Sequence, residues 1–344
     1  MKKTLLAVAI PAVFFANSAS AVEILKSDEA LVDFYGQLRT EVKKLDGTDV
    51  TLNAGSSRAG VQAQYAVTDS VDIFGKVEFG LNYNTASEDY TMKNRLHFAG
   101  VDTDFGKFSF GRQWVVADDI YGADYSYFFG GTALRYSTLS GARHDSLIKY
   151  NYEGENFIVA GNVGLAEDDT NQELAELYVA SSLGDFNFHV GGGVNTDKTG
   201  VAEGGIELEN TYYEGTVEYT FGPALIGFTY YNAEVEAKGT DAKVKENAYS
   251  LAGTYSWADN ATAYAGYEYT EQDPSNTNVI EDGDGKVFYI GTDYHFNSWS
   301  RIYVEYAYAD GQTLGYTNKG SDSFVGVASA DGESNFAVGA RVYW

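Results

Sequence analysis

Apolar and polar residues alternate through most of this chain, and this period of two constrains the fold more than any other feature. In the stretch VDIFGKVEFGLNYN, Val71 and Ile73 share one parity, whereas Asp72 and Lys76 share the other. Such alternation is typical of β-strands with one apolar and one polar face. No apolar run after residue 21 reaches the roughly 20 residues that a membrane-spanning helix requires. The sequence therefore predicts an all-β chain whose strands separate two different environments.

The first 21 residues follow a different pattern. Lys2 and Lys3 precede the apolar run LLAVAIPAVFFA, and the small residues of ANSASA follow it. This order predicts a secretory signal peptide that is cleaved after Ala21. The alternative is an N-terminal membrane anchor, but the apolar run is shorter than the roughly 20 residues that a span needs. The mature chain would then comprise residues 22–344.

The charge of the mature chain is strongly negative. Removing Lys2 and Lys3 leaves 21 basic residues against 49 acidic residues, a net charge of −28. Binding to nucleic acid requires a basic face, so we expect no nucleic-acid partner. The chain has no cysteine, so an exported protein of this sequence must be held together by hydrogen bonds and burial alone.

The number and spacing of the strands favour a membrane barrel over a soluble sheet. Aromatic residues such as Tyr65, Tyr255 and Trp257 lie near strand ends on the apolar face, as at a membrane interface, and short connections alternate with long polar ones. We therefore predict an all-β, 16-stranded antiparallel transmembrane β-barrel, with 14 or 18 strands as the alternatives. The expected strands lie at 31–43, 54–67, 71–84, 92–102, 107–113, 144–152, 157–165, 173–183, 186–194, 208–221, 224–235, 245–257, 261–271, 285–296, 299–310 and 334–344.

Five stretches carry a resemblance to a known family. They are VDFYGQ (32–37), NRLHFAG (94–100), FSFGR (108–112), FFGG (128–131) and the terminal NFAVGARVYW. In this order they resemble the Gram-negative general diffusion porins, which are homotrimers of 16-stranded barrels in the outer membrane. The resemblance implies contacts with outer-membrane lipids and lipopolysaccharide. It also implies that the barrel-assembly machinery recognises the last strand, although Trp344 replaces the commoner phenylalanine.

The resemblance also assigns a role to one long connection. In the family, the third external loop folds into the lumen and narrows it. The third long connection here is 114–143, and its FGG matches the family's inward tip, where Gly130 and Gly131 would permit a sharp turn. An acid of the family's tip corresponds to Asp124. A second acid is replaced by Phe128, which we also expect at the constriction.

Basic residues are expected on the lumen wall opposite this loop. The resemblance carries the family's wall arginines over to Arg58, Arg95 and Arg143. Lipid-facing arginine or lysine would cost roughly 2–4 kcal/mol at the midplane, so the alternation and this cost both point the basic side chains inward. By alternation the inward set also includes Arg39, Lys76 and His97. A basic wall facing an acidic loop would set a transverse field across the pore; the alternative is that these charges merely solvate a wet lumen.

The expected function is passive diffusion of ions and small hydrophilic solutes across the outer membrane. The acidic surface would concentrate cations at the mouth, which predicts mild cation selectivity. The alternative is a substrate-specific sugar channel, in which Tyr125 and Phe128 would supply aromatic contacts.

Signals for catalysis and for metal binding are weak. The sequence contains no HExxH, GxSxG or P-loop pattern, and its four histidines are scattered over different expected strands. An outer-membrane lipase would need a Ser–His pair on the lipid-facing side, and we find none, so we expect neither an enzyme nor a cofactor. EDGDGK (281–286) lacks the spacing of a 12-residue Ca²⁺ loop. Divalent cations that bridge external acidic loops to lipopolysaccharide remain the alternative.

Overall fold

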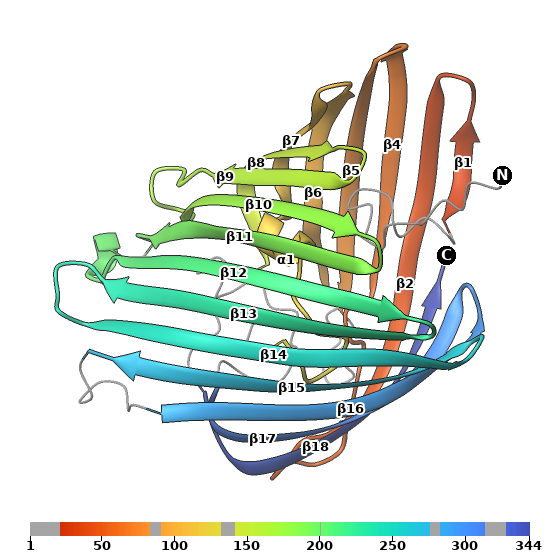
Figure 1. Cartoon of the computed structure of the whole chain (residues 1–344). Coiled ribbons are helices and arrows are strands. Elements are labelled where there is room, and N and C mark those ends of the chain that lie inside the picture. The colour runs from red at the N-terminus through yellow and green to blue at the C-terminus, as the bar shows by residue number, and fades with distance from the viewer. Residues whose placement is uncertain (1–20, 83–90, 132–141, 200, 276–282, 314–327) are drawn as a thin grey trace.

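The chain forms a closed barrel of sixteen long antiparallel strands, seen here in a computed structural model (Figure 1). The barrel closes because β18 pairs with β2, with Phe336 opposite Lys44 at one end and Tyr343 opposite Gln37 at the other. The structure describes residues 21–82, 91–131, 142–199, 201–275, 283–313 and 328–344. The sixteen long strands are β2 (Ala30–Lys44), β4 (Arg58–Thr68), β5 (Val71–Asn82), β6 (Thr91–Thr103), β7 (Gly106–Trp114), β8 (Arg143–Glu153), β9 (Phe157–Gly164), β10 (Glu173–Leu183), β11 (Phe186–Asp197), β12 (Leu208–Phe221), β13 (Ala224–Ala237), β14 (Lys243–Ala258), β15 (Ala261–Pro274), β16 (Gly283–Asn297), β17 (Ser300–Thr313) and β18 (Ala328–Tyr343).

The prediction of sixteen strands is confirmed, and each expected strand corresponds in order to one long strand. Those expected at 173–183 and 208–221 have the observed bounds of β10 and β12. Two short strands were not predicted, β1 (Val22–Lys26) and β3 (Thr51–Asn53), because so few residues give no readable alternation. The C-terminal residue Trp344 exchanges two backbone hydrogen bonds with Gly36 of β2. β1 pairs with the part of β2 that precedes Gly36, and so it lies directly beyond Trp344 along that strand.

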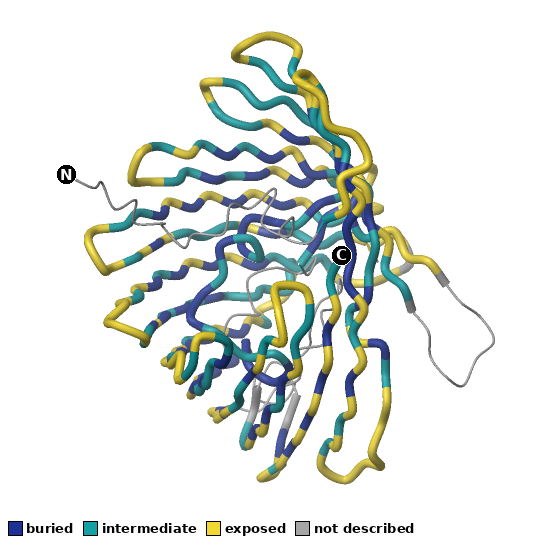
Figure 2. Tube along the Cα trace, turned by 90° about the vertical axis from the view of Figure 1, so that its right-hand side faces the viewer, coloured by how far each residue is buried: buried dark blue, intermediate teal, exposed yellow. Residues whose placement is uncertain are grey.

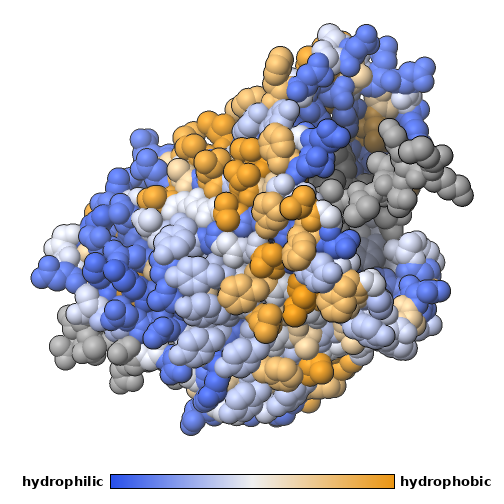
Figure 3. Space-filling view, in the orientation of Figure 1, coloured by the Kyte–Doolittle hydropathy of each residue, from blue (hydrophilic) through white to orange (hydrophobic). Residues whose placement is uncertain are grey.

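Burial alternates along the strands, as the tube in Figure 2 shows. On β17, Ile302 and Tyr306 are 45% and 38% exposed, whereas Tyr303 and Glu305 between them are buried. The exposed face is thus the apolar one, which is the arrangement expected for a barrel with lipid outside and a polar interior. On the visible surface, hydrophobic residues gather across the middle of the strands and hydrophilic residues gather at one end (Figure 3).

The connections differ in length at the two ends of the barrel. Seven tight turns join the strand pairs β4–β5, β6–β7, β8–β9, β10–β11, β12–β13, β14–β15 and β16–β17. Longer connections lie at the opposite end, and the third of them, between β7 and β8, contains the short helix α1 (Val116–Asp119). No helix in the described part of the chain has the length and apolarity needed to cross a bilayer.

One sequence-based orientation is wrong. His97 was expected to face the lumen, but it is exposed on the outer face of β6, and its neighbours Leu96 and Phe98 are buried. The cause is a bulge: Glu78 pairs with Leu96 and Phe79 pairs with Asn94, so Arg95 is an extra residue. An extra residue reverses the parity of everything beyond it, and alternation counted through Arg95 therefore fails at His97.

Candidate functional site

The segment between β7 and β8 is attached to the polar face of the sheet by its own backbone. The N–H of Val116 donates to Asn162 Oδ1 of β9 (2.7 Å), and that of Ala117 donates to Glu176 Oε2 of β10 (3.2 Å). Further along, Ala123 donates to Thr229 Oγ1 of β13 (2.8 Å). Each of these acceptors is buried. The described part of the segment therefore lies along the polar face from β9 and β10 to β13.

Two carboxylates hold the tip of this segment, and Glu305 makes most of the contacts, since Glu268 of β15 accepts only the Gly131 N–H (2.6 Å). Glu305 on β17 accepts hydrogen bonds from the successive backbone N–H groups of Tyr127 (2.7 Å), Phe128 (3.3 Å) and Phe129 (2.8 Å). Hydrogen bonds to a charged acceptor contribute about 1.5–3 kcal/mol each, more than those between neutral groups. Glu305 was not among the predicted site residues, although alternation in RIYVEYAYA places it on the polar face.

Glycine is required at the tip for two separate reasons. Gly131 has a φ of +82°, in the left-handed region that side chains disfavour. A Cβ on Gly130 would lie 2.3 Å from Asp124 Oδ1. That carboxylate also accepts the backbone N–H of Ser126 (2.9 Å). The structure thus brings Asp124, Gly130 and Gly131 together, with the carboxylate engaged inside the turn.

Phe128 is placed differently from the sequence-based expectation. Its side chain is only 1% exposed. The ring lies 5.1 Å from the ring of Tyr303, and the Lys43 ammonium lies 5.1 Å from its centroid. Phe128 is therefore part of the packing between the tip and the wall, and we correct its assignment as a residue that lines the constriction.

Three of the predicted basic residues gather around one carboxylate of β5. Glu78 Oε1 is 2.8 Å from Arg95 Nε, and its Oε2 is 3.9 Å from Arg58 Nε. Glu78 also accepts a hydrogen bond from the Tyr35 hydroxyl (3.1 Å), and the Lys76 ammonium lies 4.5 Å from the centre of the Tyr35 ring. Three cations around one anion leave this part of the wall with an excess of positive charge.

Arg143 joins the same wall through an aromatic ring. Its guanidinium lies 4.3 Å from the Trp114 ring, and that of Arg95 lies 5.5 Å from it. Cation–π contacts of this kind stabilise a guanidinium and leave its charge intact. Trp114 was not predicted as a site residue, and only its position at the end of FSFGRQW could have suggested it.

The helix α1 brings acids to this wall that the sequence did not single out. Asp119 forms an ion pair with the buried Lys149 of β8, and Asp118 lies within electrostatic reach of Arg143. Burial raises the pKa of the Asp119 carboxyl above its usual range, and the Lys149 ammonium opposes that rise. The segment therefore supplies carboxylates close to basic residues at α1.

Arg39 belongs to a further group of basic residues. It lies within electrostatic reach of Arg58 and Arg341, and it stands opposite Arg341 in the pairing of β2 with β18. Among the residues that the structure describes, no group of three or more histidine or acidic side chains is arranged to hold a metal ion.

The sequence model of the Gram-negative porins matches residues 5–314 of the chain. The chain belongs to this family. It is an outer-membrane porin of the multi-pass β-barrel type found in Gram-negative bacteria, and as a porin it forms a diffusion channel.

Individual relatives agree with this assignment. The porin is similar to OmpT, an outer membrane protein of Vibrio cholerae, at 51% identity and a TM-score of 0.85, over 94% of this chain and all of that chain. A trimer form of OmpT matches at 52% identity, a TM-score of 0.84 and 92% of this chain, again over all of that chain. Porin-like protein H of Photobacterium profundum is 27% identical over 90% of this chain and 95% of its own length.

The expectation that the chain is not an enzyme needs correction. The similar OmpT structures are described only as an outer membrane protein, which names a location and no activity. These comparisons establish a porin, and the categorical exclusion of enzymatic activity is withdrawn.

Proposed function

We propose that segment 114–143 folds into the lumen of this diffusion channel and narrows it against a basic wall. The observation that carries the proposal is the run of hydrogen bonds between the backbone of the segment and buried side chains of seven strands. The partners are Asn162 (β9), Glu176 (β10), Thr229 (β13), Ser250 (β14), Glu268 (β15), Tyr289 (β16) and Glu305 (β17). Residues 132–141 of the segment lie outside the described residues.

The charges around this segment suggest how the narrow part works. We infer a wall formed by Arg39, Arg58, Lys76, Arg95 and Arg143. Opposite it, Asp124 and the two aspartates of α1 supply negative charge from the segment. Fixed charges of opposite sign across a wide pore orient water and favour polar solutes over apolar ones.

We further propose mild cation selectivity, since a net charge of −28 on the mature chain concentrates cations at the mouths of the channel. The test is the reversal potential of the purified porin in a planar bilayer under a KCl gradient. We expect open channels with a small potential of the sign that potassium permeation gives. A clear anion preference would refute the selectivity, and a failure to conduct KCl would refute the open channel.

The sugar-channel alternative is less well supported by the contacts of its two aromatic residues. The Tyr125 hydroxyl donates to Glu218 Oε1 (2.5 Å), and Phe128 is almost wholly buried. The Phe128 ring is thus unavailable as a surface along which a sugar could slide, and the Tyr125 hydroxyl is already bound to Glu218. Block of single channels by one oligosaccharide at micromolar concentration would instead favour the specific channel.

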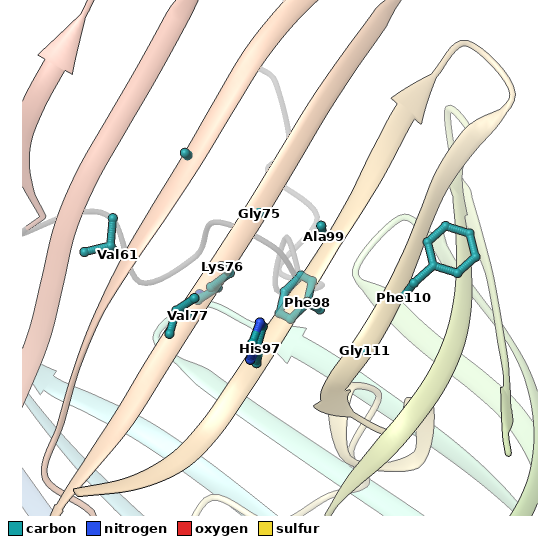
Figure 4. A pocket seen from close by; sticks show the side chains of 10 residues that line it. Val61, Gly75, Lys76, Val77, His97, Phe98, Ala99, Phe110 and Gly111 are labelled. Carbon is teal, nitrogen blue, oxygen red and sulfur yellow. The ribbon is translucent and has the colours of Figure 1, made fainter. Parts of the chain in front are cut away.

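We also propose that the porin is a homotrimer. A shallow depression of about 530 Å³ lies on the outer face of β4–β7, where Gly75, Ala63 and Ala99 leave space between larger side chains (Figure 4). His97 lines this depression. Arg112 lies beside the depression, because it stands opposite His97 in the pairing of β6 with β7, and it forms an ion pair with Asp145. Charged side chains are costly against lipid, so this surface is better suited to a neighbouring subunit.

We also propose three further partners of the porin. They are outer-membrane lipids, lipopolysaccharide with divalent cations at the external acidic loops, and the barrel-assembly machinery at the Trp344 strand. Part of EDGDGK, residues 281 and 282, lies outside the described residues. The signal peptide 1–21 does so too, except for Ala21, and N-terminal sequencing of the membrane-inserted protein would test cleavage after Ala21.

A further inference from the structure

Three inward arginines stand directly opposite one another on three adjacent strands. Arg301 of β17 pairs with Arg341 of β18, and Arg341 pairs with Arg39 of β2. We call these three residues the arginine row. Directly opposed side chains in antiparallel strands have Cβ atoms about 4.5–5.5 Å apart, and like charges at that separation are destabilising. The row therefore requires a compensating interaction.

Part of the compensation comes from tyrosine rings. The Arg301 guanidinium lies 4.8 Å from the Tyr127 ring and 5.4 Å from the Tyr343 ring. That of Arg341 lies 5.5 Å from Tyr127, 5.3 Å from Tyr303 and 5.8 Å from Tyr343. Each arginine also donates one hydrogen bond to a tyrosine hydroxyl, Arg301 to Tyr127 (2.6 Å) and Arg341 to Tyr343 (3.1 Å). These contacts hold the guanidiniums in place and leave their charge uncancelled.

The acids around the row have other partners, although Glu41 also lies within electrostatic reach of Arg39. Asp293 accepts the Tyr127 hydroxyl (2.7 Å) and lies 3.4 Å from His295 Nε2. Glu41 pairs with Lys43 at 3.1 Å, and Glu305 accepts the backbone N–H groups of the tip.

Two arginines of the row retain donor capacity. In the part of the chain that the structure describes, no ion pair joins Arg301 or Arg341 to a carboxylate, and the buried Nε of each has no hydrogen-bond partner. Arg341 has this unpaired Nε although only 8% of the residue is exposed to solvent.

We propose that the arginine row is a binding subsite for an oxyanion group, a phosphate or a carboxylate, on a solute that passes through the channel. The planar guanidinium presents parallel N–H donors that match the two oxygens of such a group, and three of them in register would share its charge. The row adjoins the inferred basic wall, because Arg39 also lies within electrostatic reach of Arg58. Its other end, Arg301, is the second residue of β17 after the short turn. This inference rests on the proposed channel and adds a local anion site to a pore that favours cations overall.

The test is block of the KCl current in planar bilayers by inorganic pyrophosphate and, separately, by citrate. We expect block that depends on concentration in the native porin. A charge-assisted hydrogen bond contributes about 1.5–3 kcal/mol, so R341Q and R301Q should each weaken block by about 10- to 100-fold. R341K, which keeps the charge without the planar fork, should give an intermediate value. The matched control is K286Q, which removes an outward-facing charge paired with Asp310 and should leave block unchanged.

The outcomes of this experiment distinguish the class of anion that binds from the absence of a subsite. Block by both probes supports a general oxyanion site, and block by one alone assigns the phosphate or the carboxylate. If neither probe blocks, or if both glutamine variants are blocked like the native porin, the subsite is refuted. The KCl conductance without either probe tests the channel itself, so failure of the channel and failure of the subsite are distinguishable. Mobility of unheated protein on gels shows whether each variant is folded.

Discussion

At the scale of single residues, Glu305 has the most concentrated set of contacts. It accepts three successive backbone N–H groups from the loop tip and a hydrogen bond from the Tyr264 hydroxyl (2.9 Å). A polar group that loses its partner in a buried site bears the full desolvation cost, about 1–3 kcal/mol. The position of the tip therefore depends strongly on this one carboxylate.

This dependence predicts the effect of removing the carboxylate. We expect Glu305→Ala to lower the free energy of unfolding by at least about 2 kcal/mol, because three donors lose their acceptor. It should also change single-channel conductance through displacement of the tip. Glu305→Gln should have a smaller effect, since its amide oxygen still accepts. Urea unfolding in detergent and bilayer recording measure the two effects.

Glu271 provides the control for that experiment, since it is exposed on β15. Glu271→Ala should leave both quantities near the native values. Native stability and conductance in Glu305→Ala would contradict the role of Glu305 in positioning the tip.

At the scale of elements, each strand separates lipid from the interior by the parity of its residues. On β14, Tyr249, Leu251 and Tyr255 are exposed, and Ser250 between the first two is fully buried. Leu251 lies near the middle of the strand, and Tyr255 lies near the short turn to β15. The same outward face thus meets the bilayer at two different depths.

Depth should determine the cost of a charge on this face. Arginine at the bilayer midplane costs about 2–4 kcal/mol and near the interface about 0–1 kcal/mol. We therefore expect Leu251→Arg to lower stability substantially and Tyr255→Arg to lower it little. Reversible unfolding in lipid vesicles measures the difference. Equal losses in both variants would contradict the placement of β14 in the bilayer.

At the scale of the whole molecule, the outer surface is not uniform. The face over β4–β7 has a depression lined by small residues and carries His97, with the Arg112–Asp145 pair beside it. In the middle of β16 and β17 the outward positions carry apolar or aromatic side chains such as Phe288, Ile290 and Ile302, and the outward ion pair Lys286–Asp310 lies near the long-loop ends of these strands. This asymmetry supports a subunit interface on one side of the barrel and lipid on the other.

A bulky substitution distinguishes the two environments. Ala99→Trp fills the depression and should convert trimers to monomers, as measured by light scattering of the protein in detergent. Ala265→Trp, on the outward face of β15, is the matched control and should leave the trimer intact. Trimers of unchanged stability with Ala99→Trp would place the interface elsewhere.

The alternation of residues also explains how far sequence analysis could reach. It gave the count of strands, and it put Arg58 and Arg95 on polar faces, because parity is local. It failed at His97, where one inserted residue reversed the parity without any mark in the sequence. It also could not show that Phe128 is buried, because that depends on Tyr303, which is 175 positions away in the chain.

The sequence by itself determined a membrane barrel of sixteen strands, since lipid and water impose a period of two on every strand that crosses between them. Only the tertiary structure decided which distant side chains meet. Closure of β18 on β2 aligned Arg341 with Arg39, and the path of the segment after β7 brought Tyr127 to Arg301. Such contacts depend on register between strands and on the course of a long connection. Neither leaves a periodic signal in the sequence.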